Sequence, residues 1–243
     1  MGPLVAYVVV ATGVLGALIG SFLNVVIWRV PRGVSIVSPG SACPECGAPI
    51  RAIDNLPVLS WMILRAKCRD CSAPISARYP LIEVITAILF ALIAAWRAPA
   101  VLEDAGISLT VGLLEWLALL VFAACSVALT VIDLELYRLP TPIVAFLAAS
   151  SAVLLGLAGA LGGNWDALLR AAVGGIACAA VFLVVALIKP EGMGFGDIRL
   201  AGALGIILGY VGWGALLVGF FTAFLLGGLV GILLILFRKI PAR

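Results

Sequence analysis

The sequence predicts an all-α, polytopic membrane protein of about seven transmembrane helices, with a small cysteine-bearing insertion after the first helix. Hydrophobic residues make up 64% of the chain and charged residues only 11%, against roughly 25% charged residues in soluble domains. Apolar stretches long enough to cross a bilayer recur along the chain, and residues 29–79 form the only long polar segment. The chain has no histidine, which excludes Ser-His-Asp and Cys-His catalysis and histidine metal ligands.

The first apolar run covers residues 4–28, and positive charge comes only after it, at Arg29 and Arg32. That order of charge predicts a membrane span and argues against a cleaved signal peptide. Six further spans are predicted at residues 80–97, 109–132, 142–161, 168–188, 198–211 and 213–237. We therefore divide the chain into a first helix (1–28), a four-cysteine domain (29–79) and a transmembrane core (80–243).

Positive charge predicts how these spans are oriented. With the N-terminus outside and seven crossings, thirteen of the fifteen Lys and Arg residues fall on the cytoplasmic side; Arg97 and Arg170 are the exceptions. This distribution agrees with the positive-inside rule. It predicts a multi-pass protein of the cell (inner or plasma) membrane, embedded in lipid, with the cysteine segment and the C-terminus in the cytoplasm.

The polar segment contains two C-x2-C knuckles separated by 21 residues: Cys43, Cys46, Cys68 and Cys71. Four thiolates at this spacing favour a closed, tetrahedral zinc site of the structural kind, and so a zinc-ribbon-like insertion. Gly47 and Ser72 directly after the knuckles suit the tight turns that such sites need. A pair of disulfides is the alternative, which a cytoplasmic location disfavours.

A glycine-rich stretch from Glu191 to Arg199 lies between two apolar runs and ends in an acidic residue. Gly194 and Gly196 let the backbone adopt unusual conformations and let another chain approach closely. Asp197 is a carboxylate at the edge of the hydrocarbon region, which marks a candidate functional group. The alternative is a solvated turn, with the aspartate capping the following helix.

A second acidic position ends the third predicted span on the same side of the membrane. Asp133 directly follows an unbroken apolar run, and Glu135 lies about 200° away around the helix. One of the two can therefore face the bundle interior while the other faces water or headgroups. Pro140 and Pro142 are expected to break the chain before the next span.

Two aspartates at one membrane surface suggest a reaction. When two carboxylates share a site, one is held protonated while the other stays charged. The charged carboxylate can take a proton from water, while the protonated one polarises a scissile carbonyl. Asp133 and Asp197 are therefore predicted to hydrolyse peptide bonds as a general acid/base pair. Zinc held by four thiolates has no open position for catalysis.

These motifs resemble the type IV prepilin peptidases, which are bifunctional leader peptidase/N-methyltransferases. Gly194-Phe-Gly-Asp197 matches their GxGD motif, shared with presenilin-type proteases, and Asp133 with Leu139-Pro140 is similar to their first catalytic aspartate. The resemblance extends to residues 20–31, to the cysteine segment with Asp54-Asn-Leu-Pro57 and Ser60-Trp61, and to residues 78–83. The chain departs from the family pattern at Thr141 and Arg199.

The resemblance implies cleavage of a basic leader peptide from prepilins or pseudopilins on the cytoplasmic face. It also implies methylation of the new N-terminal residue with S-adenosylmethionine. No nucleotide-binding glycine fingerprint supports the second activity, so it rests on the resemblance alone. Glu83, at the start of the second span, is a candidate for it and could equally be a satisfied interfacial carboxylate.

Alternative functions remain open from sequence. The chain could be a peptidase without methyltransferase activity. A transporter would also place carboxylates at glycine-broken helices, although no inverted repeat is visible. A non-enzymatic assembly protein would use the zinc domain for docking, and leaves the pairing of Asp133 with Asp197 unexplained. Nothing in the sequence points to a nucleic-acid partner.

Overall fold

The computed structural model describes residues 2–188 and 194–238, and these form two compact units, Met1–Gly162 and Gly163–Arg243. Glu191, Gly192 and Met193 of the glycine-rich stretch lie outside the described residues, as does Lys189. Within the described ranges the chain is helical and has no strand, apart from two isolated β-bridges in the cysteine segment.

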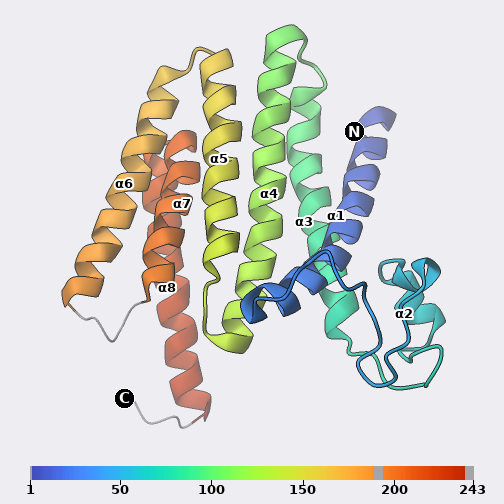
Figure 1. Ribbon diagram of the computed structural model, residues 1–243. Helices are drawn as coiled ribbons and strands as arrows, with labels where there is room; N and C mark the ends of the chain where they lie inside the picture. The colour runs from blue at the N-terminus through green and yellow to red at the C-terminus, as the bar shows by residue number, and fades with distance from the viewer. Residues whose placement is uncertain (1, 189–193, 239–243) are drawn as a thin grey trace. The chain divides into compact units, whose positions relative to one another are not determined.

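The first unit contains four long helices: α1 (Pro3–Arg29), α3 (Arg78–Val101), α4 (Gly106–Leu136) and α5 (Thr141–Leu161) (Figure 1). Between α1 and α3 lie the short helices η1 (Val30–Arg32), η2 (Ala52–Asn55) and α2 (Leu59–Ile63). The second unit contains α6 (Trp165–Ile188), α7 (Phe195–Val211) and α8 (Trp213–Arg238).

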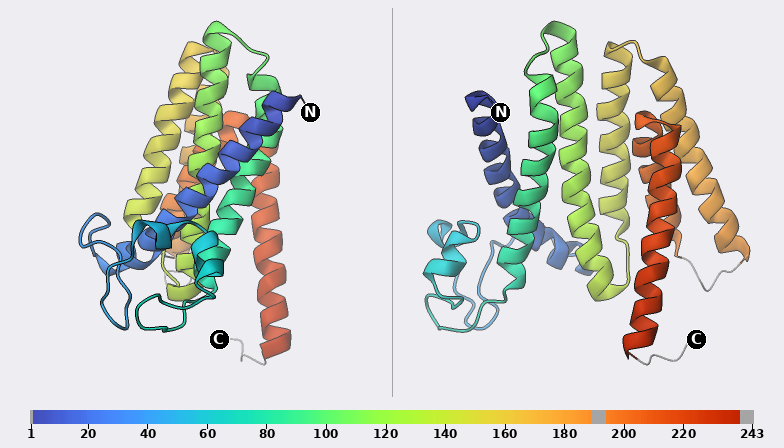
Figure 2. Two further views of the ribbon diagram at one scale, coloured as in Figure 1. Left: turned by 90° about the vertical axis from the view of Figure 1, so that its right-hand side faces the viewer. Right: turned by 180° about the vertical axis from the view of Figure 1, so that it is seen from behind.

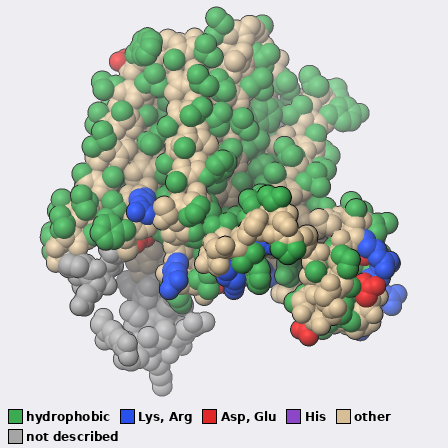
Figure 3. Space-filling model, viewed as in Figure 1, with side chains coloured by type: hydrophobic (Ala, Val, Ile, Leu, Met, Phe, Trp, Pro, Cys, Tyr) green, Lys and Arg blue, Asp and Glu red, His purple; other side chains and the backbone are tan. Residues whose placement is uncertain are grey.

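All seven predicted spans are helical, which confirms the all-α class. Five described helices are long and apolar enough to cross a membrane: α1 with η1, α3, α4, α5 and α6. α7 has only 17 residues, in line with the short sixth span expected from sequence, and α8 is apolar over Trp213–Leu229. Hydrophobic side chains cover the helices in Figure 3, whereas charged side chains gather on the cysteine segment at the lower right.

Close packing of α1 on α3 holds the first unit together. A Cβ atom added to Gly20 would lie 2.6 Å from Glu83 Cα, and one added to Gly16 would lie 2.8 Å from Phe90 Cβ. These glycines therefore set how near the two helix backbones come, as small residues do in membrane bundles. Further along, Ala94, Ala98 and Val101 of α3 form a buried cluster with Trp116 of α4. Figure 2 shows α3 and α4 side by side in both views.

Glycines also bring two helices close together in the second unit. A Cβ on Gly205 or Gly209 of α7 would collide with backbone atoms of Gly174 or Arg170 in α6. Because glycine has no side chain, the two helix backbones come into direct van der Waals contact here. The edge-to-face rings of Phe182 and Phe220, with centroids 6.0 Å apart, join α6 to α8.

One end of the first unit gathers its polar groups. The cysteine segment leaves the end of α1 and returns at the start of α3, and α4 ends nearby (Figure 1). An ion pair of 3.0 Å between Arg78 Nη1 and Glu135 Oε1 joins the start of α3 to the end of α4. Asp133 therefore lies at the same end of this unit as the cysteine segment.

Candidate metal centre and aspartate positions

The two cysteine knuckles repeat one backbone design. In the first, the N–H of Cys43 donates to Ala48 C=O (2.9 Å) and the N–H of Gly47 donates to Cys43 C=O (2.9 Å). The second repeats this pattern at Cys68, with hydrogen bonds of 2.8 and 2.9 Å involving Ala73 and Ser72. Gly47 (φ +70°) and Ser72 (φ +61°) take the left-handed conformation that closes each turn, as the sequence predicts.

These turns bring four thiols together. The Sγ atoms of Cys43, Cys46, Cys68 and Cys71 all lie within 4.8 Å of one another. Cys43 Sγ and Cys71 Sγ are 3.8 Å apart, the edge of a tetrahedron whose centre lies about 2.3 Å from each sulfur, roughly the zinc–thiolate bond length. The donor set and its geometry therefore fit a tetrahedral metal ion. The two remaining cysteines, Cys125 and Cys178, are buried in α4 and α6, away from this cluster.

Two of the four thiols, Cys43 and Cys71, differ in pKa. Backbone N–H groups of Cys46 and Glu45 lower the pKa of Cys43 to about 7. At Cys71 the Ala73 N–H acts to lower the pKa, but desolvation and hydrogen bonds with the other three thiols raise it to about 12. The Cys43 thiolate therefore forms readily near neutral pH, whereas Cys71 would need a bound cation to ionise.

Ion pairs anchor the second knuckle to η2. Arg69 lies between two metal-ligating candidates and donates to Asp54 through Nε (2.9 Å to Oδ2) and Nη2 (2.5 Å to Oδ1). Hydrogen bonds from Arg69 hold the pKa of Asp54 below its usual value. The more exposed pair of Arg51 and Asp70 (3.2 Å) adds a second link.

Glu83 connects the membrane helices to the cysteine segment. Its side chain is only 8% exposed, and Oε2 accepts a 2.7 Å hydrogen bond from the N–H of Val58, with a further bond from Ser21 of α1. Val58 has φ +61° and ψ −49°, and the N–H of Leu59 lies 2.6 Å from Pro57 C=O. This is a γ-turn, a rare and strained conformation for a β-branched residue. Glu83 therefore holds a strained turn at the start of α2.

A hollow of about 300 Å³ lies between the end of α1 and this segment. Its walls include Ser21 and Phe22 of α1, Val37 and Gly40 of the following loop, and Asn55 of η2. Arg29, also in its wall, is 8% exposed and donates to Ser35 C=O (2.8 Å) and Gly40 C=O (3.3 Å). The hollow thus combines an apolar side with a guanidinium, a hydroxyl and an amide.

Asp133 lies one turn before the end of α4 and its side chain is exposed. Tyr137, in the left-handed conformation (φ +52°), ends the helix and donates its N–H to Asp133 C=O (2.8 Å). Pro140 then caps α5, which confirms the expected break in the chain. Glu135 forms an ion pair with Arg78, and the catalytic role of Asp133 stays a prediction.

Asp197 lies in the first turn of α7. Its Oδ2 accepts a 3.0 Å hydrogen bond from the N–H of Gly194, and its own N–H donates to Gly194 C=O (3.1 Å). Gly194 is the N-cap residue and Asp197 lies three residues later, with its carboxylate bonded back to the N-cap N–H, so Asp197 is not the N-cap that the alternative expected. Gly194 has φ −81° and ψ 152°, extended backbone that any residue adopts, and a Cβ added there would come no nearer than 3.4 Å to Asp197 Oδ2, so the described residues do not explain the glycine.

Sequence reasoning missed three features of this region. Arg29 is noticed from sequence only as a positive charge after a span, whereas in the structure it organises the loop up to Gly40. The strained turn at Val58 gives no sequence signal, because valine is disfavoured there. The position of Arg69 inside a knuckle, with an acidic residue fifteen positions upstream, is a signal that could have been used.

Comparison with known proteins covers both units of the chain. The bacterial peptidase A24 N-terminal domain model matches residues 14–97, and the type IV leader peptidase family model matches residues 120–232. The prepilin leader peptidase/N-methyltransferase of Aeromonas hydrophila is 37% identical over 91% of this chain and 79% of its own length. No solved structure gives a significant match.

Two other relatives carry the same name. The protein of Pseudomonas putida is 35% identical over 96% of this chain and 83% of its own length. The protein of Myxococcus xanthus strain DK1622 is 39% identical over 97% of this chain and 64% of its own length. With two family models and relatives matched over most of their length, the chain belongs to the type IV leader peptidase family.

Proposed function

We propose that this chain is a membrane-embedded aspartic endopeptidase that removes the leader peptide from prepilins or pseudopilins and then N-methylates the new N-terminus. The observation that carries the proposal is the match to relatives named prepilin leader peptidase/N-methyltransferase, which covers the N-terminal and peptidase regions alike. A transporter or a purely structural protein has no such support.

Asp133 and Asp197 are the proposed acid/base pair. If each long helix crosses the membrane once, two crossings, α5 and α6, separate the end of α4 from the start of α7, so the two aspartates reach the same membrane face. The Gly194 hydrogen bond to Asp197 Oδ2 fixes that carboxylate and leaves Oδ1 to meet a water or the substrate. The charged aspartate accepts a proton from the attacking water, while its protonated partner donates a hydrogen bond to the scissile carbonyl.

The membrane orientation belongs to the same proposal. The N-terminus lies outside the inner membrane, and both aspartates, the cysteine segment and the C-terminus lie on the cytoplasmic side. The cations of the cysteine segment and the hydrophobic cover of the helices support this arrangement (Figure 3). Substrates with a basic leader ahead of an apolar helix would then present the leader at this face.

Zinc is the proposed metal of the four-cysteine cluster. All four candidate ligands are thiols, and Cys43 and Cys71 lie at the sulfur–sulfur distance of a tetrahedral site. With no open position, the ion has a structural role. The short polar segment, which has few buried residues of its own, would gain its folding energy from the ion.

The methyl donor S-adenosylmethionine is proposed for the hollow beside Ser21 and Asn55. The guanidinium of Arg29 suits the donor's carboxylate, and the apolar wall at Phe22 and Val37 suits its adenine ring. When bound, the donor supplies an electrophilic methyl group. Glu83 is a positioning residue, because it contacts Ser21 in the wall and Val58 behind it.

Incubation of the purified full-length protein in detergent with a prepilin-like peptide and S-adenosylmethionine tests the proposal. Mass spectrometry should find a shortened peptide that carries one added methyl group. An intact peptide with folded protein would refute the peptidase. A cleaved but never methylated peptide would reduce the function to peptidase alone.

A further inference from the structure

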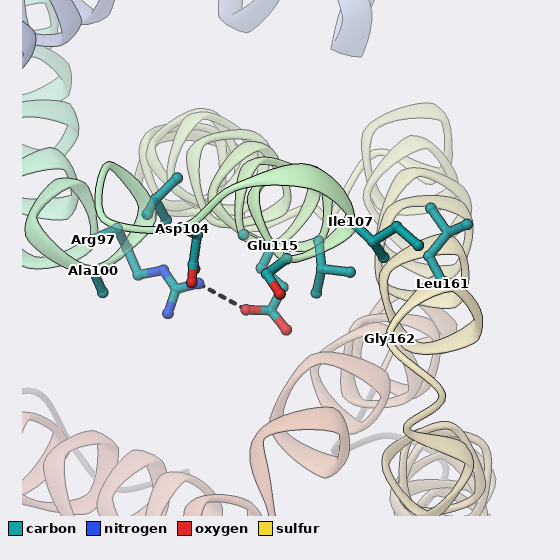
Figure 4. Close-up of a pocket in the computed structure, with 11 residues that line it drawn as sticks. Arg97, Ala100, Asp104, Ile107, Glu115, Leu161 and Gly162 are labelled. Carbon is teal, nitrogen blue, oxygen red and sulfur yellow. Dashed lines mark hydrogen bonds and ion pairs between the residues drawn. The ribbon is translucent and has the colours of Figure 1, made fainter.

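A second polar hollow lies at the other end of the first unit, away from Asp133 and the cysteine segment. It measures about 480 Å³ and is formed by the end of α3, the start of α4 and the end of α5. Three charged side chains of both signs line it: Arg97, Asp104 and Glu115 (Figure 4). Neither proposed activity uses these residues.

Arg97 is held by an ion pair, but one of its N–H groups has no acceptor among the described residues. Its Nη2 donates to Glu115 Oε2 at 2.7 Å, and its guanidinium lies 5.6 Å from the centre of the Trp96 ring. The Nε of Arg97 is shielded from solvent and has no hydrogen-bond partner among the described residues. A buried donor of this kind is costly unless an acceptor satisfies it, and phosphate is an acceptor that a guanidinium binds well.

The remaining charges restrict what the hollow can take. A simple anion such as free phosphate would be repelled by the carboxylates of Asp104 and Glu115, while a simple cation would leave Arg97 unsatisfied. A zwitterion with a phosphate next to an ammonium group satisfies both signs. Asp104 is exposed at the lining of the hollow, where it can meet an ammonium. Ser108 adds a hydroxyl donor for phosphate.

The depth of the hollow fits a lipid headgroup. It lies where membrane-length helices α3, α4 and α5 end or begin. Trp96 on the adjoining turn is 69% exposed, and exposed tryptophan marks the headgroup level in membrane proteins. Ile107 and Leu161 in the lining are also exposed apolar side chains, which offer a surface to acyl chains next to the polar site.

We propose that this hollow binds the ethanolamine-phosphate headgroup of a membrane phospholipid, with Arg97 on the phosphate and Asp104 on the ammonium. Glu115 is a positioning residue that keeps Arg97 turned toward the hollow. The bound lipid would bridge the loop between α3 and α4 and the end of α5. The bound lipid would therefore stabilise the end of the first unit that lies away from Asp133 and the cysteine segment.

Native mass spectrometry of the full-length protein in detergent, titrated with single lipids, tests the assignment. The wild type should retain phosphatidylethanolamine about tenfold better than phosphatidylglycerol, since one charge pair separates the two headgroups. Asp104→Asn should erase that preference. Glu103→Gln, a neighbouring acidic residue that does not line the hollow, should keep it. Equal retention of both lipids by the wild type would overturn the proposal.

Loss of Arg97 should weaken both lipids. Because Arg97→Gln leaves Glu115 without its partner, the double variant Arg97→Gln/Glu115→Gln removes both charges at once, and prepilin cleavage reports that it is folded. Undiminished lipid retention by a folded double variant contradicts the assignment. Soluble O-phosphoethanolamine, added as a competitor, shows whether the hollow needs the whole lipid or only its headgroup. If a large excess of it is needed to displace bound phosphatidylethanolamine, the lipid assignment is supported. If it displaces the bound lipid as efficiently as free phosphatidylethanolamine does, the membrane assignment is overturned.

Discussion

The cysteine segment and the two aspartate positions use charge in opposite ways. In and beside the segment, charged side chains bind other parts of the chain. Arg69 forms an ion pair with Asp54, Arg29 donates hydrogen bonds to the loop that follows it, and Glu83 of α3 accepts a hydrogen bond from the turn at Val58. The Asp197 carboxylate instead accepts a hydrogen bond from the N–H of Gly194, three residues away, and the N–H of Tyr137 bonds the backbone C=O of Asp133, not its side chain. Removal of a charge that holds the fold should therefore lower stability, whereas removal of a charge that performs chemistry should lower activity and leave stability nearly unchanged.

The sharpest test of this contrast is the aspartate pair. Asp133→Asn and Asp197→Asn should each lower prepilin cleavage about 10²–10⁴-fold, because each removes one member of an acid/base pair. The double variant should cost little more, since groups acting as a unit are not additive. Cleavage rates are measured in detergent, together with a bell-shaped pH profile for the wild type.

Controls for the pair are available on the same helices. Asparagine can still accept the Gly194 hydrogen bond, so the melting temperature of Asp197→Asn should change little. Glu135→Gln should retain most activity, because Glu135 is occupied by Arg78. An active, folded Asp133→Asn beside an inactive Glu135→Gln would show that the wrong carboxylate of α4 was chosen.

Removal of the metal should affect folding first. Elemental analysis of wild-type protein purified without added metal should find about one zinc per chain. Cys43→Ser should lose the metal and leave the segment open to proteolysis, because structural zinc contributes on the order of 10 kcal/mol to small domains. Cys125→Ala, a cysteine outside the cluster, is the matched control. A metal-free wild type, or disulfides within the knuckles in cells, would disprove the zinc site.

Glu83 should separate the two proposed activities. Glu83→Ala leaves the N–H of Val58 without its acceptor, a loss worth about tenfold in the affinity for S-adenosylmethionine. Glu83→Gln keeps an acceptor oxygen and should be milder. Donor binding by calorimetry, and the KM and kcat of methylation of a pre-cleaved peptide, distinguish a positioning residue from a catalytic one. A large fall in kcat with unchanged donor binding would point to direct catalysis instead.

Methylation of a pre-cleaved peptide also tests whether the peptidase and methyltransferase activities are separable. Asp197→Asn should still methylate a pre-cleaved pilin peptide, because the proposed donor site lies among α1, η2 and the cysteine segment. Loss of methylation in this variant, with wild-type donor binding, would contradict the division of work between the two regions.

The smallest expected effect concerns pH and Asp54. Arg69 holds the pKa of Asp54 below its usual value, so the carboxylate stabilises the segment above the unfolded pKa of about 3.9. That contribution is lost as pH falls through the lower folded pKa. Because the pair is near the surface, the effect is small. The melting temperature of wild type relative to Asp54→Asn should converge below about pH 4, and Asp70→Asn is the control.

The helices and the four-cysteine cluster were predictable from the sequence. Long apolar runs define helices whatever they pack against, so the seven helical ranges were predicted to within a few residues at most ends. Two C-x2-C knuckles carry their own turn geometry, so the four-thiol cluster was predicted as well. The roles of Asp133 and Asp197 in catalysis stay predictions.

What the sequence could not predict depends on contacts between distant residues. Glu83 looks like an interfacial carboxylate until Val58, twenty-five positions away, is seen to donate to it. Arg97 and Glu115 look like ordinary charges near a loop until the structure pairs them beside a hollow. Such pairings arise from helix packing, which the hydrophobic pattern does not specify residue by residue.

The length of α7 has a consequence for the surrounding bilayer. Its 17 residues give a rod of roughly 26 Å, shorter than a hydrocarbon layer of about 30 Å. A bilayer that meets such a helix thins around it at a modest cost per ångström. Asp197 lies in the first turn of this helix, so the thinned lipid would lie next to its carboxylate. A pilin helix anchored in the membrane would then move a shorter distance through the hydrocarbon layer before its leader junction reaches water.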